Sequence, residues 1–452
     1  MNFRIFTLIF AITINFAFLA YAKGTLTGAM VSAYNTSGLL EQNRAVLRAA
    51  DEDVATAASQ LAPVVSWASS VSHSGSDSSS FDTSASVSLL ANFTVYDGGE
   101  RSLGLEAAKF SVLATRSSLI NIEQNVLFEA VNAYLGVIRE TENVSLREGN
   151  LSVINEELRA ANDRFEVGEI TKTDVALAEA RLAASKSALA VAKGAYERAV
   201  ASYRSKIGEN PNTLEYPSFV PVVPNSLENA IAIALTEHPS IDELKNLVKV
   251  SEINSKIADL STGFTVSLGS SVSLDEEGEA SGNVSVTASG PIFSGGKLYS
   301  SSRKKIALNE QVLARLYSSK ISIEQNVTNA FSSLEVAKAA KLAAEEQIRA
   351  TEVALKGVKE EAILGARTTL DVLNSEQELL DARVQLISAK VDQHLSLYRL
   401  LLQIGRLNSD YLDLPLRKYD VKKYYELVKD SPVDKTAIGK ELNKILKSLG
   451  KN

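Results

Sequence analysis

Four stretches of the chain alternate apolar residues with Ser, Thr, Asn or Gly, and they occur as two pairs. The clearest stretch is residues 86–95, in which Val, Leu, Ala, Phe and Val occupy every second position. A period of two residues is typical of a β-strand with one apolar and one polar face. The two pairs predict β-hairpins over residues 64–96 and 262–292. A half-buried hairpin of a soluble sheet has the same alternation, so the pattern alone leaves the environment of these strands open.

Each predicted β-hairpin is followed by a much longer stretch with a helical period, over residues 98–207 and 295–405. The first stretch contains no proline between residues 100 and 165, which corresponds to a helix on the order of 100 Å long. In both stretches, apolar residues spaced alternately three and four positions apart form a coiled-coil seam. The seam residues are Leu151, Ile154, Leu158, Ala161 and Phe165 in the first stretch and Ile348, Thr351, Leu355, Val358 and Ala362 in the second. A further helix is predicted before each β-hairpin, over residues 24–62 and 227–260.

A short turn containing a glycine interrupts both long helical stretches. Its sequence is RFEVGEITKTDV at residues 164–175 and EAILGARTTLDV at residues 361–372. Gly168 and Gly365 are 197 positions apart, as are the two seams, whereas the motif EQNV recurs after 201 positions. About one helical turn has therefore been inserted and later removed. These repeats predict an internal duplication with two helical hairpins, whose tips are the two glycine turns.

The duplication divides the chain into five segments. We expect a signal peptide at residues 1–22, a first repeat at 23–208 and a second repeat at 226–408. The linker between the repeats, residues 209–225, holds four of the nine prolines and is predicted to be extended. Residues 409–452 are predicted to form a C-terminal segment and a mobile tail.

The first 22 residues have the features of a secretory signal. Arg4 precedes an apolar run, and Ala20, Tyr21 and Ala22 form a small-x-small cleavage site. A retained N-terminal membrane helix is the alternative. No later segment has 18 continuous apolar residues, which is the length expected of a membrane-spanning helix. We therefore expect an exported protein that no helix anchors in a membrane.

The composition argues against several classes of chemistry. The chain has no cysteine, which excludes disulfides and thiolate metal sites, and its three histidines lie in unrelated contexts. The net charge of −7 comes from 47 basic and 54 acidic residues that are interspersed, so no basic surface for nucleic acid is indicated. There is no Gly-x-Ser-x-Gly motif and no pair of carboxylates in a recognisable pocket. We expect no enzyme activity, no cofactor and no metal.

The number of predicted strands in one chain is too small for a closed membrane barrel. Each has about ten residues, a length suited to a tilted membrane-spanning strand with a lipid face and a water face. Open sheet edges do not occur in lipid, and closed membrane barrels have at least eight strands. One chain supplies four strands. The protein is therefore predicted to oligomerise, with eight strands from two chains or twelve from three.

The motifs at the two turns resemble those of the TolC-like outer-membrane efflux and secretion channel family. The first is FxVGxxTxxDV at residues 165–175, and the second is LGxRTTLDVL at residues 364–373, followed by NxEQELL at 374–380. With the duplication and the strand pairs, the resemblance covers the chain from residue 23 to about residue 406. The tail that begins LxLP at residue 412 is similar to members that serve type I protein secretion.

The resemblance implies an α+β membrane protein that is a homotrimer. Four strands per chain would form a twelve-stranded outer-membrane β-barrel, continuous with a long α-helical barrel that extends into the periplasm. The linker at residues 209–225 and the C-terminal segment from residue 409 would form a mixed equatorial region around the helices. A periplasmic adaptor and an inner-membrane ABC or proton-driven exporter would dock at the hairpin tips. The channel would export proteins, small molecules or both, in one step. A periplasmic adaptor protein is the alternative function, because adaptors are also exported and have long helical hairpins.

In the family that this chain resembles, ion pairs and hydrogen bonds hold the closed tip. By motif position Arg367 corresponds to the cation and Asp174 to its partner. Asp371 corresponds to a ring of aspartates that narrows the pore entrance, and Asn374 stands where the family pattern has a second acid. Ala362 stands where that pattern has a tyrosine that braces the gate. Alternatively, the two aspartates are carboxylates in the first turn of a helix, where they are favoured.

The resemblance also implies a docking surface for partner proteins at the two turns. Its expected residues are Val167, Gly168, Thr171, Leu364, Gly365 and Thr368.

Overall fold

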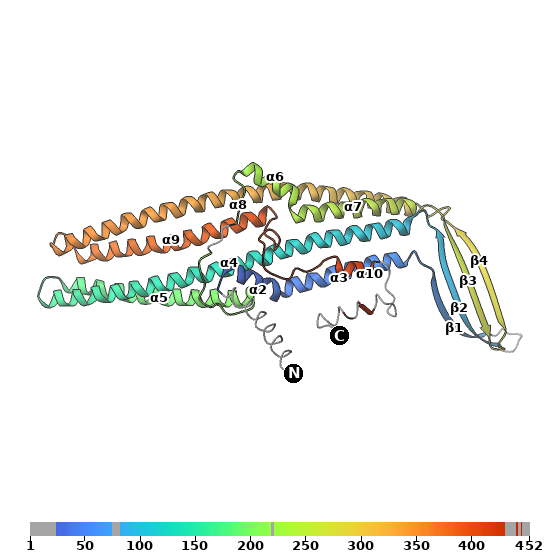
Figure 1. Ribbon diagram of the computed structural model, residues 1–452, viewed down its shortest axis with the longest axis horizontal. Helices are drawn as coiled ribbons and strands as arrows, with labels where there is room; N and C mark the ends of the chain where they lie inside the picture. Colours follow the sequence, from blue (N-terminus) through green and yellow to red (C-terminus); the bar gives the residue numbers. More distant parts are fainter. Residues whose placement is uncertain (1–23, 75–81, 218–220, 430–439, 442–443, 445–452) are drawn as a thin grey trace, which may run out of the picture. The chain divides into compact units, whose positions relative to one another are not determined.

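The computed structural model describes residues 24–74, 82–217, 221–429, 440–441 and 444 of the chain (Figure 1). The predicted signal peptide and most of the predicted mobile tail lie outside these residues. The described part is mostly helical and contains one antiparallel sheet. None of the described helices combines the length and the apolar composition that a membrane crossing requires.

The four longest helices form the two helical hairpins. Helix α4 (Glu100–Glu166) is followed by α5 (Lys172–Ile207), and α8 (Lys297–Ile363) is followed by α9 (Thr369–Gln403). These are the long helices that the helical period predicts. Their seam residues Ile154 and Ala161 are buried and pack in one cluster with residues of α5 and α9. Burial of this face, rather than intrinsic propensity, stabilises such helices.

Helices α4 and α8 both have 67 residues, although their matching EQNV motifs lie at different positions. Gln124 is residue 25 of α4, whereas Gln325 is residue 29 of α8. The four extra residues before the motif in α8 are compensated by four fewer residues after it. Since four residues are about one helical turn, both motifs stay on nearly the same face of their helices.

The helix before each β-hairpin is broken, which differs from the continuous helices predicted over residues 24–62 and 227–260. The first becomes α2 (Leu26–Thr36) and α3 (Gly38–Ser59), and the second becomes α6 (Leu227–Glu237) and α7 (Pro239–Leu260). Ser37 has an extended backbone, and its hydroxyl accepts a hydrogen bond from the backbone N–H of Leu40. His238 is extended because it precedes Pro239, which disfavours the helical conformation.

The sheet contains β1 (Val64–Ser74), β2 (Asp82–Tyr96), β3 (Thr265–Asp275) and β4 (Ala280–Ser289) in that order, all antiparallel. The two predicted β-hairpins are thus present, and β2 pairs with β3 to join the two repeats. Among the described residues, the outer edges of β1 and β4 have no strand partner.

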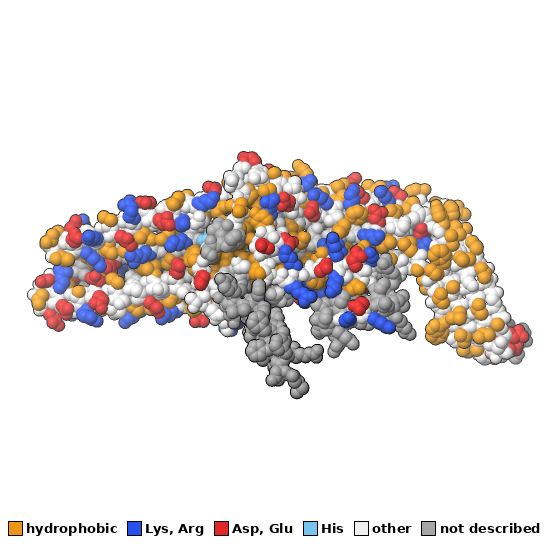
Figure 2. All heavy atoms as spheres, viewed as in Figure 1, with side chains coloured by type: hydrophobic (Ala, Val, Ile, Leu, Met, Phe, Trp, Pro, Cys, Tyr) orange, Lys and Arg blue, Asp and Glu red, His pale blue; other side chains and the backbone are white. Residues whose placement is uncertain are grey.

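The two faces of the sheet differ in chemistry. Hydrophobic side chains gather over the strands in Figure 2, and Trp67 and Val284 are each 73% exposed. The polar positions carry serines that hydrogen-bond across strands, as between Ser88 and Ser273 at 3.0 Å. An exposed apolar face of this kind is stable only where another apolar medium covers it.

The chain divides into two compact units, and each unit draws on both halves of the sequence. One unit comprises residues 1–41, 120–238 and 321–418, and so contains both hairpin tips. The other comprises residues 42–119, 239–320 and 419–452, and so contains the sheet. In the second unit the short helix α10 (Lys423–Val428) packs on α3 through Tyr424 and Val428, which contact Ala55.

The end of α5 offers a test of the first unit. Gly208 has a φ of 88°, and a Cβ added there would lie 2.6 Å from the Thr36 hydroxyl oxygen. We expect Gly208→Ala to lower the free energy of unfolding by about 1–3 kcal/mol, measured by thermal unfolding of the purified protein in detergent. Gly149, within α4, has open space around its Cβ position. Gly149→Ala is the control and should stabilise by roughly 0.5–1 kcal/mol; equal losses from both would contradict this account.

Candidate gate and docking site at the hairpin tips

The tip of the first hairpin is built by a helix cap. Thr171 is the N-cap of α5, and its hydroxyl oxygen accepts a hydrogen bond from the Asp174 N–H. The Asp174 carboxylate accepts in return from the Thr171 N–H at 2.9 Å and from its hydroxyl at 2.7 Å. Gly168 turns the chain with a φ of 82°, which costs other residues steric strain. This reciprocal pairing is a capping box, and it satisfies backbone donors that the helix leaves free.

The tip of the second hairpin repeats the arrangement. Thr368 caps α9, and the Asp371 carboxylate accepts from its N–H at 2.9 Å and from its hydroxyl at 2.8 Å. Gly365 has a φ of 77°. The hydrogen bonds from Thr171 and Thr368 hold the pKa values of Asp174 and Asp371 below the ordinary range, so both carboxylates are ionised at neutral pH.

The structure does not bring Arg367 and Asp174 together within one chain. Arg367 Nε donates instead to Glu361 Oε2 at 2.8 Å, and this pair raises the pKa of the arginine. Asp174 is engaged by Thr171 through its capping box. A gate pair between Arg367 and Asp174 remains a prediction, and it concerns contact between copies of the chain.

Each tip carries one ion pair across its turn, and the two pairs have opposite polarity. In the first tip Arg164, near the end of α4, lies 3.1 Å from Glu169 in the turn. In the second tip Glu361, near the end of α8, pairs with Arg367 in the turn. Arg164, Glu169 and Glu361 were not singled out from the sequence. The signal was available as opposite charges five or six positions apart across a glycine turn.

The six turn residues predicted to dock partners are all exposed. Val167 is 72% exposed and Leu364 is 84% exposed, and the neighbouring Ile363 is 85% exposed. Large apolar side chains at such exposure are suited to contact with another protein. Ala362, in contrast, is buried.

Asn374 connects the two hairpins. Its side-chain oxygen accepts a hydrogen bond from Arg181 Nη2 of α5 at 2.7 Å. Nothing in the local sequence of Arg181 indicates this contact, because the two residues are 193 positions apart.

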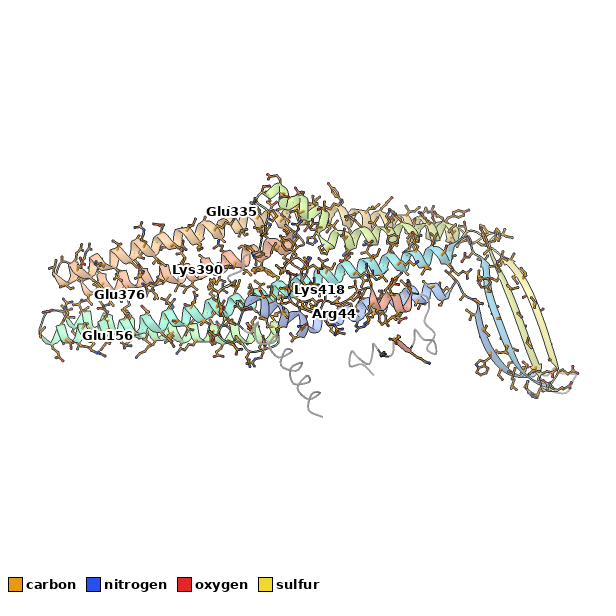
Figure 3. The ribbon with its side chains drawn as sticks, in the orientation of Figure 1. Arg44, Glu156, Glu335, Glu376, Lys390 and Lys418 are labelled. Atoms are coloured by element: carbon orange, nitrogen blue, oxygen red, sulfur yellow. The ribbon has the colours of Figure 1, made fainter. Side chains whose placement is uncertain are left out.

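A second contact between the hairpins is a partly buried ion triad. Lys359 Nζ of α8 lies 2.5 Å from Glu376 of α9 and 3.6 Å from Glu157 of α4. Glu376 is 6% exposed, and Figure 3 shows it between the two hairpins. Burial lowers the pKa of Lys359, but the two carboxylates outweigh burial and hold that pKa above its ordinary value. Beside the triad is a cleft of about 430 Å³, lined by residues of α4, α8 and α9.

The described residues contain no group of three or more His, Asp or Glu side chains that could hold a metal ion. The described residues of the tips present ion pairs, hydrogen bonds and exposed apolar side chains.

Comparisons with known proteins all indicate one family. A family model described as "Outer membrane efflux protein" matches residues 31–209 and 256–406. The outer membrane efflux protein BepC of Brucella suis is 34% identical over 413 residues, which are 90% of this chain and 91% of BepC. The alkaline protease secretion protein AprF of Pseudomonas aeruginosa is 25% identical over 64% of this chain and 63% of its own.

The fold is shared with solved outer-membrane channels. The Campylobacter jejuni CmeC outer membrane channel superposes with a TM-score of 0.77 at 15% identity, over 90% of both chains. These findings support a transport protein rather than an enzyme, and they do not support the alternative of a periplasmic adaptor.

The ion triad makes a prediction for stability. Lys359→Met leaves the buried Glu376 carboxylate without its nearest cation, and we expect a loss of roughly 1–3 kcal/mol in unfolding free energy. The double variant Lys359→Met/Glu376→Gln removes both charges and should recover most of this loss, as measured by denaturant unfolding in detergent. A double variant as unstable as the single one would contradict the assignment.

The same triad determines whether its contribution to the unfolding free energy rises or falls with pH. Because the folded pKa of Lys359 lies above its ordinary value of 10.5, its stabilising effect is complete below pH 10.5. The effect is lost as the pH rises through the folded pKa. In the unsubstituted protein, the unfolding free energy should therefore fall as the pH rises through the folded pKa of Lys359. In Lys359→Met this contribution to the fall should be absent, as measured by denaturant unfolding across the alkaline range.

Proposed function

The chain belongs to the outer membrane efflux protein family, and we propose that three copies of it form a channel through the outer membrane. The channel exports proteins, small molecules or both, and it receives them from an inner-membrane ABC or proton-driven exporter through a periplasmic adaptor. Its helical hairpins extend into the periplasm, and the tips form the gated end.

The observation that carries this proposal is that the four-stranded sheet of one chain has two open edges. One chain supplies four antiparallel strands with an exposed apolar face and, among the described residues, two outer edges without a strand partner. A strand in lipid must have every backbone group paired, so the sheet has to close on itself. Three chains supply twelve strands, which exceeds the eight strands of the smallest closed membrane barrels. The alternation of apolar and polar residues then places lipid outside and water inside.

The charged residues at the tips suit an electrostatic gate. In the proposed closed state, Arg367 of one copy pairs with Asp174 of a neighbouring copy, in addition to its contact with Glu361. Threefold symmetry brings three Asp371 carboxylates around the axis. A ring of three carboxylates attracts cations to the pore entrance. Asn374 adds no charge there, which makes the entrance less anionic than one with two acids.

The exposed apolar residues at the tips are suited to binding the proposed periplasmic adaptor. Val167 and Leu364 are largely exposed in the turns that precede the two capping boxes. Large apolar side chains at such exposure are suited to burial against a partner protein. The range of cargo is supported by the names of the relatives, since one is an efflux protein and another is a protease secretion protein.

Channel formation and the gate can be tested together. The purified full-length protein in detergent should have the mass of three copies and conduct ions in a planar lipid bilayer. Arg367→Ala/Asp174→Ala removes the proposed pair between copies and should raise the single-channel conductance several-fold. Glu378→Ala, an exposed change farther along α9, is the control and should leave conductance unchanged. A monomer without conductance would overturn the channel, and an unaltered conductance in the double variant would overturn the gate pair.

The proposed ring of Asp371 has a separate test. Asp371→Asn removes three negative charges from the pore entrance and should lower the preference for cations over anions, measured by the reversal potential in a salt gradient. Glu378→Gln is the control, because it removes an exposed carboxylate farther along α9 that has no part in the proposed gate. It should leave ion selectivity unchanged. Equal changes in selectivity from the two variants would overturn the proposed ring of Asp371.

A further inference from the structure

A glutamate and a glutamine in the middle of α4 hold the turn that follows α9. Gln124 Nε2 donates a hydrogen bond to the Gly405 carbonyl oxygen at 2.6 Å, in a buried position. Glu123 accepts a hydrogen bond from the Ser409 backbone N–H at 2.7 Å. We call this two-residue contact the Glu-Gln clamp. It joins the first hairpin to the second within one chain.

The internal duplication supplies the parts of a second clamp. Residues 323–327 repeat the motif IEQNV of residues 122–126, and they contain Glu324 and Gln325 in α8. The turn after α5 repeats the turn after α9. Gly208 has a φ of 88° where Gly405 has 80°, and Asn212 stands four residues after its glycine, as Ser409 does. The sequence therefore carries a second clamp and a second turn.

The two sets of residues differ in burial. Gln124, Gly405 and Ser409 are buried in the chain. Their counterparts Gln325, Gly208 and Asn212 are all exposed, and so is Glu324.

The helices that carry the second set also have an open face. Helix α9 buries twelve residues, whereas its counterpart α5 buries four, so more of the α5 surface is left uncovered within the chain. Within the same compact unit, α8 exposes Val336 and Val353 at 68% and 67%, and α5 exposes Val191 at 67%. Large apolar side chains at this exposure are expected to be covered by another surface.

We infer that the second clamp closes between two copies of the chain. Gln325 of one copy donates to the Gly208 carbonyl of the next copy, and Glu324 accepts from the Asn212 backbone N–H of that next copy. Helix α8 of one copy then lies beside α5 of the next, as α4 lies beside α9 within a chain. This inference rests on the proposed channel, and it identifies the atoms that join its copies.

Two features of the chain fit this assignment. The hydroxyls of Ser32 and Thr36 both donate to the Ile207 carbonyl oxygen, at 3.1 and 2.9 Å, and so fix the peptide that leads into Gly208. The acceptor of the second clamp is thus held in place before a partner arrives. Each copy also presents one clamp and one turn at different positions, which is a head-to-tail interface, the type that forms a ring when the rotation between copies closes.

Cysteine cross-linking tests the second clamp without background, because the chain has no cysteine of its own. The variant Glu324→Cys/Asn212→Cys places one thiol at each side of the proposed junction. A short bis-maleimide applied to the full-length protein in detergent should give covalent dimers and trimers on a denaturing gel. Glu123→Cys/Ser409→Cys is the matched control at the first clamp, and it should cross-link within the chain and migrate as a monomer.

The possible outcomes distinguish an error in the second clamp from an error in the proposed channel. If the control cross-links while Glu324→Cys/Asn212→Cys stays monomeric on the gel in a protein that still has the mass of three copies, the second clamp is wrong and the channel stands. Dimers from Glu324→Cys alone would place two α8 helices together and also overturn the clamp. An unmodified protein that is monomeric and does not conduct would overturn the channel itself.

A second measurement covers variants that fold poorly after cysteine substitution. Gln325→Ala should lower the temperature at which three copies dissociate in detergent, with little change in the circular dichroism of the separated chains. Gln124→Ala should instead lower the unfolding temperature of the chain itself. If Gln325→Ala leaves the dissociation temperature unchanged, the contact does not join the copies.

Discussion

The architecture depends on backbone hydrogen bonds that one chain cannot complete. Strands β1 and β4 each have a single neighbour, so two rows of N–H and C=O groups lie at outer edges in the described residues. In hydrocarbon each such group costs several kcal/mol if it stays unpaired. Pairing β4 of one copy with β1 of the next satisfies both edges with one type of contact. In the proposed channel, the closure of the barrel and the ring of helices that continues it both depend on this pairing.

Much of the fold was predictable because its signals are local. The strands have a two-residue alternation, the long helices have a continuous apolar seam, and each tip has a glycine followed by a Thr-x-x-Asp capping box. The break at Ser37 was missed because one extended residue interrupts a helix without disturbing the apolar pattern on either side. The break at His238 was also missed, although Pro239 signals it in the sequence. The contacts Lys359–Glu376 and Arg181–Asn374 were missed because their partners come from different helices. The gate pair stays a prediction because it concerns contact between copies.

The duplication explains why similar sequences carry out different tasks. Both tips use the same cap, yet Arg164–Glu169 and Glu361–Arg367 place their charges in opposite order. Both long helices have the IEQNV motif, yet only Gln124 finds its carbonyl within the described part of the chain. A repeat whose contacts are satisfied internally stabilises the protomer. A repeat whose equivalent groups remain exposed is available for assembly.

The four-residue offset between α4 and α8 has an evolutionary consequence. Adding four residues to a helix advances the downstream residues by about 6 Å and rotates them by roughly 400°, which is within about 40° of their former direction. Adding two residues would turn the same side chains to the opposite side and detach them from their neighbours. Insertions and deletions in these helices are therefore tolerated mainly in steps near a whole turn. In α4 and α8 the insertion and the deletion each amount to about one turn, so the motif moves along the helix axis while its side chains keep nearly the same direction.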